Sequence, residues 1–503
     1  MIHRITFFLL LMAGIVFVPH QLVAQGKVDP KKTKVDPKKK VDLSSFYRVM
    51  SALKPEDQIK AVGDKMRDSN PGFKDFSYAK IEGGVVARVG VDATYVVDVA
   101  PLRAFAGLKE LSASAATYMG GKITDLTSLA GLKLEHLDLV YNADLTDISV
   151  VKGMPIKFLR CDHTKIASIE PLEGCTTLET LKCNSTRVTN LKPLKGLTLK
   201  GLECSMCRGE KGDTVSDLSP LAGMKLERFY CDKISAKDFS VLKPMPIAEL
   251  SVGDNLQITD FTILKDMPLK ELYLTRTRFT EKDGLILKGK PIRTLYLYGT
   301  PIKDLLFVKD LPLDLLVCSA CTQLKDLHPL KGMKIKTFYC GETPIKDLGP
   351  LEGMPLTSLY CQDTSISSLE PLKGMPLDIL WCGWRNRKGR SPLTDLSPLA
   401  GTPIRTLYCE NTSIKDLKPL SSMKVVVLRC DNTPIKDLKP LAGTPVVELW
   451  CQGTSVVDFA PLKDAEKLST LKCDYKLPKD AAALRSIKSL RMLNGLNAQN
   501  LLN

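Results

Sequence analysis

Short blocks of alternating apolar and polar positions recur along most of this chain. Residues 359–375 read LYCQDTSISSLEPLKGM, residues 407–423 read LYCENTSIKDLKPLSSM, and residues 428–444 read LRCDNTPIKDLKPLAGT. With the Cys as the marker, equivalent positions run from 91 to 473 and define eighteen units with a mean spacing of about 22 residues. Self-similarity at such a period indicates a solenoid built from stacked units.

Each unit predicts a short strand and a compact return segment. Leu359 and Cys361 alternate with Tyr360, so the first two side chains point to one face and the third to the other. In the return segment an Asp is expected to cap a helical turn, and a following Pro and Gly limit that turn to 3-10 size. Three such Asp residues are Asp347, Asp416 and Asp437, and the matching prolines are Pro350, Pro419 and Pro440.

One unit of this length cannot enclose a core, so the units must stack. The sequence therefore predicts an α/β solenoid arc over residues 85–476, with parallel strands on the concave face and short 3-10 turns on the convex face. Helical caps are expected at both ends. The N-terminal cap spans residues 43–84 and has a second helix that begins at Pro55. The C-terminal cap spans residues 477–503.

The unit L-x-C-x-x-T-x-I-x-D-L-x-P-L-x-G-M resembles the short, internalin-like class of leucine-rich repeat found in exported bacterial proteins. The resemblance implies a binding scaffold, without enzymatic activity, whose concave strand face meets a partner that is usually a protein. Two departures stand out. Cys replaces the strand Leu in 12 units, and Thr mostly replaces the repeat's Asn, which Asn142 and Asn255 retain.

The first residues of the chain resemble an export signal. Residues 1–24 have a basic start at Arg4, an apolar stretch over residues 5–18 and a cleavage site at Leu22-Val23-Ala24. An uncleaved anchor is the alternative. Residues 25–42 form a Lys- and Pro-rich stretch that predicts a disordered linker. No apolar run reaches the roughly 18–20 residues of a membrane-spanning helix, so we expect an exported protein, either secreted, periplasmic or in the cell envelope.

The 15 cysteines follow the repeat. Twelve occupy the inward marker position, Cys207 and Cys321 stand at the Thr position, and Cys175 follows a Gly. We expect buried free thiols that pack as small apolar groups. Some disulfides and a ladder of soft metal ions are the alternatives. The sequence predicts no cofactor and no resident metal.

The formal net charge is +15, which makes nucleic acid a partner to test. The three outward strand positions of the units, however, hold six basic and twelve acidic residues. Nucleic acid requires a concentrated basic surface, so we expect none as a partner. His136, His163 and His328 are scattered singly and form no catalytic group.

Aromatic residues concentrate at the position just before the marker. From residue 230 onward that position holds Tyr230, Ser251, Tyr273, Tyr296, Val317, Tyr339, Tyr360, Trp381, Tyr408, Arg429 and Trp450, and Tyr298 lies on the same face. Because these positions alternate with core residues, we expect their side chains to be exposed on the concave face. An exposed apolar track indicates a ligand-binding surface. Strand propensity and cross-strand stacking are the alternative explanation.

Two insertions interrupt the repeat. The one after Cys382 reads GWRNRKGRSP and places Trp384, Arg385 and Arg387 at the rim beside Trp381. The one after Cys204 reads SMCRGEKGD. Either they recognise an acidic group or they are tolerated loops. The sequence thus predicts a monomeric scaffold for a protein partner, with an envelope polysaccharide or a purely structural role as alternatives.

Overall fold

The computed structural model describes residues 43–385, 390–476 and 478–502. The predicted signal and linker, residues 1–42, lie outside the described residues, as does Arg387. The chain divides into two compact units, Met1–Arg48 and Val49–Asn503, and the fold described below is that of the second. Among the described residues, no helix combines the length and the apolar character needed to cross a membrane.

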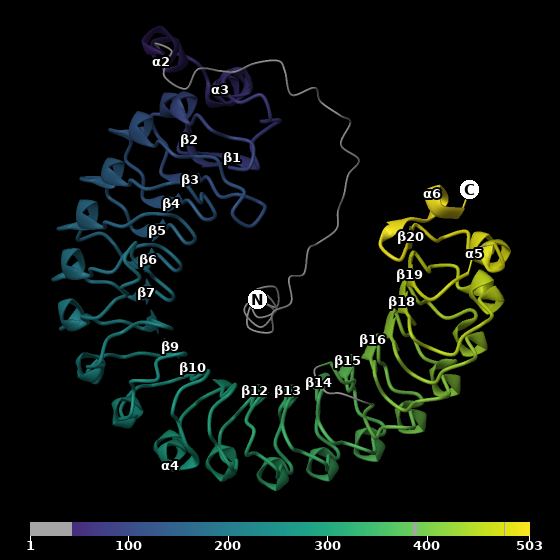
Figure 1. Cartoon of the computed structure of the whole chain (residues 1–503). Coiled ribbons are helices and arrows are strands. Elements are labelled where there is room, and N and C mark those ends of the chain that lie inside the picture. The colour runs from purple at the N-terminus through teal and green to yellow at the C-terminus, as the bar shows by residue number, and fades with distance from the viewer. Residues whose placement is uncertain (1–42, 386–389, 477, 503) are drawn as a thin grey trace. The chain divides into compact units, whose positions relative to one another are not determined.

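Val49–Asn503 forms an α/β solenoid arc, as the repeat predicts (Figure 1). Strands β2 to β19 pair in chain order, each parallel to the next, and a 3-10 turn follows most of them on the outer side. Hairpins β1–β2 and β20–β21 are antiparallel. The strands are β1 (Tyr78–Glu82), β2 (Val85–Gly90), β3 (Glu110–Ser112), β4 (His136–Asp138), β5 (Phe158–Arg160), β6 (Thr180–Lys182), β7 (Gly201–Glu203), β8 (Arg228–Tyr230), β9 (Glu249–Ser251), β10 (Glu271–Tyr273), β11 (Thr294–Tyr296), β12 (Leu315–Val317), β13 (Thr337–Tyr339), β14 (Ser358–Tyr360), β15 (Ile379–Trp381), β16 (Thr406–Tyr408), β17 (Val427–Arg429), β18 (Glu448–Trp450), β19 (Thr470–Lys472), β20 (Met492–Leu493) and β21 (Leu496–Asn497).

The 3-10 turns have the predicted Asp caps. The Oδ1 atoms of Asp347, Asp416 and Asp437 accept the backbone N–H two residues later at 2.7, 2.8 and 2.8 Å. Each bond satisfies a donor that the short turn leaves open. The turns are η1 (Ala100–Ala104), η2 (Thr127–Leu129), η3 (Ser149–Val151), η4 (Glu170–Leu172), η5 (Lys192–Leu194), η6 (Ser219–Leu221), η7 (Ser240–Leu242), η8 (Thr262–Leu264), η9 (Leu285–Leu287), η10 (Leu306–Val308), η11 (His328–Leu330), η12 (Gly349–Leu351), η13 (Glu370–Leu372), η14 (Ser397–Leu399), η15 (Lys418–Leu420), η16 (Lys439–Leu441) and η17 (Ala460–Asp464).

The core lies between the strands and the turns. Leu359 and Cys361 are buried, and so are their equivalents along the sheet. Asn142 joins two coils, because its Nδ2 donates to the carbonyls of Leu139 in its own coil and Ala113 in the preceding coil, at 2.9 and 2.8 Å. Thr364 replaces only the first of these bonds, to the carbonyl of Cys361 at 2.6 Å.

The cysteines lie where the repeat predicts. All 15 are free thiols, fourteen of them buried and Cys175 half-buried. Cys207 and Cys321, at the Thr position, donate to the carbonyls of Cys183 and Leu297 in the preceding coil at 2.9 and 3.1 Å. These two thiols therefore provide the bond between coils that Thr364 lacks.

The ends of the solenoid contain more than the helices expected there. Helix α2 (Ser44–Met50) lies mostly in the first compact unit, and α3 (Pro55–Ser69) lies in the second, followed by β1, which the repeat does not predict. The hairpin between β1 and β2 turns at Gly83 and Gly84, which have φ of +57° and +77°, a region that favours glycine. At the C-terminus, α5 (Ala481–Ser486) and α6 (Ala498–Leu502) flank β20 and β21. A short helix α4 (Glu281–Gly284) precedes η9.

Candidate binding surface

The aromatic residues form a column because each is the last residue of its strand. We call the residues that end β8 to β18 the aromatic ladder: Tyr230, Ser251, Tyr273, Tyr296, Val317, Tyr339, Tyr360, Trp381, Tyr408, Arg429 and Trp450. Each pairs in register with the next. Neighbouring strands lie about 4.8 Å apart, so adjacent side chains of the ladder are in contact range.

The N-terminal part of the ladder contains three tyrosines. The Tyr230 and Tyr273 ring centroids are 5.9 Å apart, across the small side chain of Ser251. Tyr273 and Tyr296 are 4.7 Å apart. Val317 then interrupts the rings.

The C-terminal part is longer and ends in basic residues. Tyr339 and Tyr360 stack at 4.0 Å, Tyr360 and Trp381 meet edge to face at 6.5 Å, and Trp381 and Tyr408 do so at 5.5 Å. The Arg429 guanidinium lies 4.6 Å from the Tyr408 ring centroid and 3.8 Å from that of Trp450. Lys472, which ends β19, lies 3.4 Å from the Trp450 ring centroid.

The ladder is less exposed than the alternation predicts. Tyr296 is 6% exposed, Val317 is 0% and Ser251 is 4%, so the expectation of exposure was wrong at these three positions. The remaining aromatic residues are half-buried. The physical reason is that large side chains on adjacent strands cover the smaller or more central side chains between them.

Carboxylates line the first strands of the ladder. The hydroxyl of Tyr230 donates to Oε2 of Glu249 at 3.2 Å, and that of Tyr273 to Oε2 of Glu271 at 2.8 Å. Arg228 also donates to Glu249, at 2.8 Å. Burial raises the pKa of both tyrosines, so each remains a hydrogen-bond donor at neutral pH.

Glu410 is a half-buried residue that follows the ladder strand β16 on this face. Its Oε1 accepts the indole N–H of Trp381 at 2.9 Å, while Oε2 is buried and has no partner among the described residues. Burial raises the pKa of Glu410 to about 7. The backbone of Gly383 runs against it, since a Cβ there would lie 2.7 Å from Oε2.

The predicted rim residues Trp384 and Arg385 and the predicted face residue Tyr298 have separate environments. The indole N–H of Trp384 donates to the Thr364 carbonyl at 2.7 Å, which ties the insertion to the preceding coil. Arg385 is exposed, with its guanidinium 4.9 Å from the Trp381 ring centroid. Tyr298 is half-buried and forms no ring stack with another described residue. The side chain of Arg385 thus contacts an aromatic ring of the ladder.

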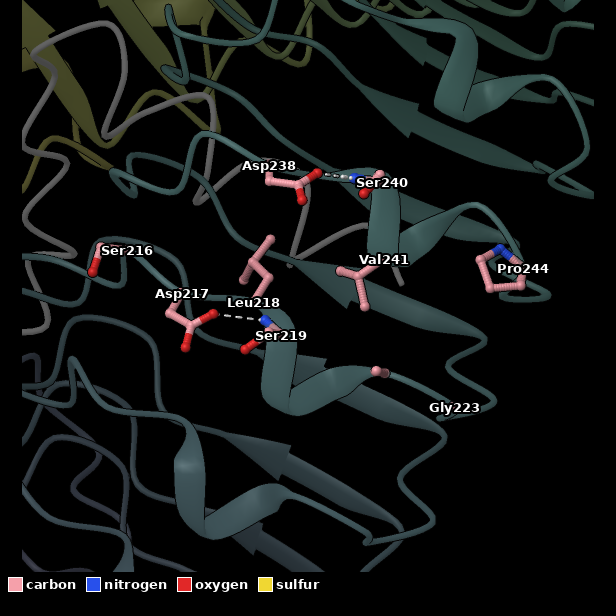
Figure 2. Close-up of a pocket in the computed structure, with 10 residues that line it drawn as sticks. Ser216, Asp217, Leu218, Ser219, Gly223, Asp238, Ser240, Val241 and Pro244 are labelled. Atoms are coloured by element: carbon pink, nitrogen blue, oxygen red, sulfur yellow. Dashed lines mark hydrogen bonds between the residues drawn. The ribbon is translucent and has the colours of Figure 1, made fainter.

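The convex side has a cavity of about 340 Å³ between η6 and η7 (Figure 2). Asp217 and Asp238 line it, but their Oδ1 atoms accept the backbone N–H groups of Ser219 and Ser240 at 2.8 Å each. These carboxylates therefore serve the turns, as in other coils, and the cavity is a groove between neighbouring units.

Parallel strands, capped 3-10 turns and the Asn and Thr positions together define a leucine-rich repeat solenoid. No protein-family model and no curated protein sequence matches the chain. Solved structures similar to it include an internalin from Listeria monocytogenes, at 18% identity over 85% of this chain and 98% of that chain, with a TM-score of 0.31. The functional domain of InlJ from Listeria monocytogenes, which includes a cysteine ladder, is 21% identical over 69% of each chain, with a TM-score of 0.41. A leucine-rich repeat protein of Leptospira interrogans is 14% identical over 87% of this chain and 97% of that chain, with a TM-score of 0.39. The solenoid of parallel strands and 3-10 turns that the repeat predicts is present in the structure itself.

Proposed function

We propose that this protein is an exported, non-catalytic scaffold that binds an extended segment of a protein partner along the aromatic ladder. The observation that carries the proposal is the composition of the ladder. Of the eleven residues that end the consecutive strands β8 to β18, eight are Tyr or Trp. Aromatic side chains of intermediate exposure are typical of the energetic centres of protein interfaces. Export is supported by the sequence of residues 1–24.

Ring orientation favours a protein over a polysaccharide. Sugar rings stack on open aromatic faces, but Tyr339 and Tyr360 cover one another, with their planes 5° from parallel. Arg429 and Lys472, from the strands on either side, both lie over the Trp450 ring. The ladder therefore offers mainly ring edges and polar side-chain atoms, which suit the mixed side chains of a polypeptide.

A pull-down with a ladder variant tests this function. The variant replaces Tyr339, Tyr360 and Trp381 by Ser, and Tyr95→Ser is the control, because Tyr95 is 52% exposed and lies outside the ladder. Circular dichroism melting must first show that both variants fold. Wild type and control, immobilised, are expected to retain a protein from the exported fraction of native cells, and the ladder variant to lose it.

Two other outcomes of the pull-down would contradict a protein partner at the ladder. Retention of envelope polysaccharide by wild type, with loss in the ladder variant, would replace the protein partner by a glycan. Equal retention of the same ligand by all three proteins would mean that the ladder serves strand packing and that binding, if any, occurs elsewhere.

A further inference from the structure

A second cluster of aromatic rings precedes the ladder in the sequence. It lies in the loops that follow strands β3, β4 and β5. The rings of Tyr118, Tyr141 and His163 form a triad in which each contacts the other two, with centroid distances of 5.3, 5.3 and 5.1 Å. Tyr118 is 55% exposed and the neighbouring Met119 is 47% exposed. We call Tyr118, Tyr141 and His163 the aromatic triad.

One member of the triad, Tyr141, occupies a position that disfavours it, whereas histidine is among the residue types enriched at positive φ. The second residue after each marker adopts positive φ in most coils, +66° at Tyr141 and +58° at His163. The backbone is held there because its N–H donates to the next coil, from Tyr141 to the Asp162 carbonyl at 3.1 Å and from His163 to that of Asn184 at 2.9 Å. Bulky side chains are unusual in this conformation, whereas Gly, Asn and Asp are tolerated.

Six of the ten later coils with positive φ at the same position use Gly, Asn or Asp, and the other four hold Lys233, Arg276, Ala320 and Glu342. Asp254, Gly299, Asn411, Asn432 and Gly453 are among the six. The early coils instead place Tyr141, His163 and Met206 there, the last with φ of +57°. Large apolar groups at strained positions are thus confined to one part of the solenoid edge, which indicates a local requirement that folding does not impose.

His163 and Met206 line a cavity of about 300 Å³ that has a basic border, and Tyr141 lies behind His163. Tyr118, Met119, His163 and Met206 form part of its wall, and Lys165, Arg187 and Arg208 complete the charged side. Burial lowers the pKa of His163, so its ring is neutral at pH 7.

One positive charge of this border is uncompensated. Lys165 pairs with Asp144 at 2.5 Å, and Arg187 pairs with Glu210. The exposed side chain of Arg208 forms no hydrogen bond or ion pair with a described residue. Aromatic rings alone could bind a cation. The positive charges of the lysine and arginines around this cavity repel one, so a cationic ligand is excluded.

We propose that this edge cavity is a second docking site, which takes a protein segment that presents a large apolar side chain next to a carboxylate. The apolar side chain fills the space between Tyr118, His163 and the two methionines, and the carboxylate pairs with Arg208. The site lies outside the aromatic ladder and does not depend on the function proposed for it.

A peptide selection tests the site directly. The bait is the full chain with Tyr339, Tyr360 and Trp381 replaced by Ser, which removes the ladder's contribution, and the probe is a phage-displayed library of random twelve-residue peptides. We expect enrichment of peptides with Phe, Leu or Trp next to Asp or Glu. Synthetic versions of the enriched peptides are then titrated against wild type and variants by calorimetry.

Tyr141→Asn removes the ring that supports Tyr118 and His163 in the cavity wall, and it separates binding from folding because Asn tolerates the positive φ. It is expected to weaken peptide binding about tenfold or more without lowering the melting temperature, and Arg208→Glu is expected to weaken it similarly. Glu342→Asn, a change at the equivalent position of a later coil, is the control and should leave binding unchanged. Absence of enriched peptides, enrichment without carboxylates, or binding that survives both Tyr141→Asn and Arg208→Glu would overturn the proposal.

Discussion

Tyr339 and Tyr360 lie face to face, with ring centroids 4.0 Å apart and planes 5° from parallel. They end the paired strands β13 and β14 and stand directly opposite one another in register. Each therefore removes one face of the other from solvent, which contributes to the partial burial of both side chains.

Stacking between these two tyrosines should be measurable as a coupling energy. In a double-mutant cycle of Tyr339→Ala and Tyr360→Ala, we expect a coupling of about 0.5–1.5 kcal/mol in the free energy of unfolding, beyond the loss of buried area. Urea unfolding followed by circular dichroism measures it. The pair Tyr230 and Tyr360, which are separated by several strands, should be additive within about 0.5 kcal/mol. Equal coupling in both cycles would contradict the stacking account.

Glu410 should make stability fall with rising pH. Its pKa in the folded protein, about 7, lies above the ordinary value of 4.5. Between these pH values the folded state binds more protons than the unfolded state, so the free energy of unfolding decreases as pH rises, by up to about 1.4 kcal/mol per unit. The contribution is complete below pH 4.5 and is lost above 7.

Glu410→Gln should remove this part of the pH dependence. We expect the variant to be more stable than wild type above pH 7 and to show a shallower slope between pH 5 and 7. Urea unfolding followed by tryptophan fluorescence suits the measurement, since Trp381 donates its indole N–H to Glu410. An unchanged slope in the variant would show that Glu410 titrates in its ordinary range.

The thiols should react in two classes. Burial raises the pKa of Cys361, Cys409 and Cys430 well above the ordinary value, which suppresses the reactive thiolate. In native protein a thiol reagent should therefore modify at most the half-buried Cys175 quickly. In denaturant without reductant all 15 should react. Fewer than 15 reactive thiols would show that some cysteines form disulfides. Metal that co-purifies with the protein would support the alternative of a ladder of soft metal ions.

The Asp caps should stabilise their turns individually. Asp437 accepts the N–H of Lys439 at 2.8 Å, and Asp437→Ala is expected to cost about 0.5–2 kcal/mol of unfolding free energy. Asp437→Asn keeps an acceptor oxygen and should cost less. Chemical denaturation of both variants tests this, and equal losses would mean that charge and not the hydrogen bond matters.

The repeat was predictable from sequence because its chemistry is periodic. Leu359, Cys361 and Asp437 recur at the same places in many units, so strands, core thiols and capped turns follow from the pattern. Strand β1 was missed because it lies outside the repeat and pairs with β2 through a glycine hairpin. The burial of Tyr296 was missed because alternation indicates which face a side chain points to, but not how far its neighbours on adjacent strands cover it.

The aromatic triad was not predicted for a similar reason. In the sequence His163 is a single histidine with no other histidine near it, and Tyr118 lies in a long spacing between markers. Their meeting depends on how successive coils align at the solenoid edge. One signal was present in the sequence: the position that holds Asn, Asp or Gly in many later units holds Tyr141 and His163 in the early ones.

Site-specific photo-crosslinking tests the central claim most directly. Benzoylphenylalanine is placed at Tyr408 in the ladder or, as the control, at Leu306 on the convex side, where the side chain is 67% exposed. After irradiation in native cells, the account predicts one discrete protein adduct from position 408, none from position 306, and loss of the adduct when Tyr339, Tyr360 and Trp381 are replaced by Ser. The same adduct from both positions, or none from position 408 while a ligand remains bound, would contradict it.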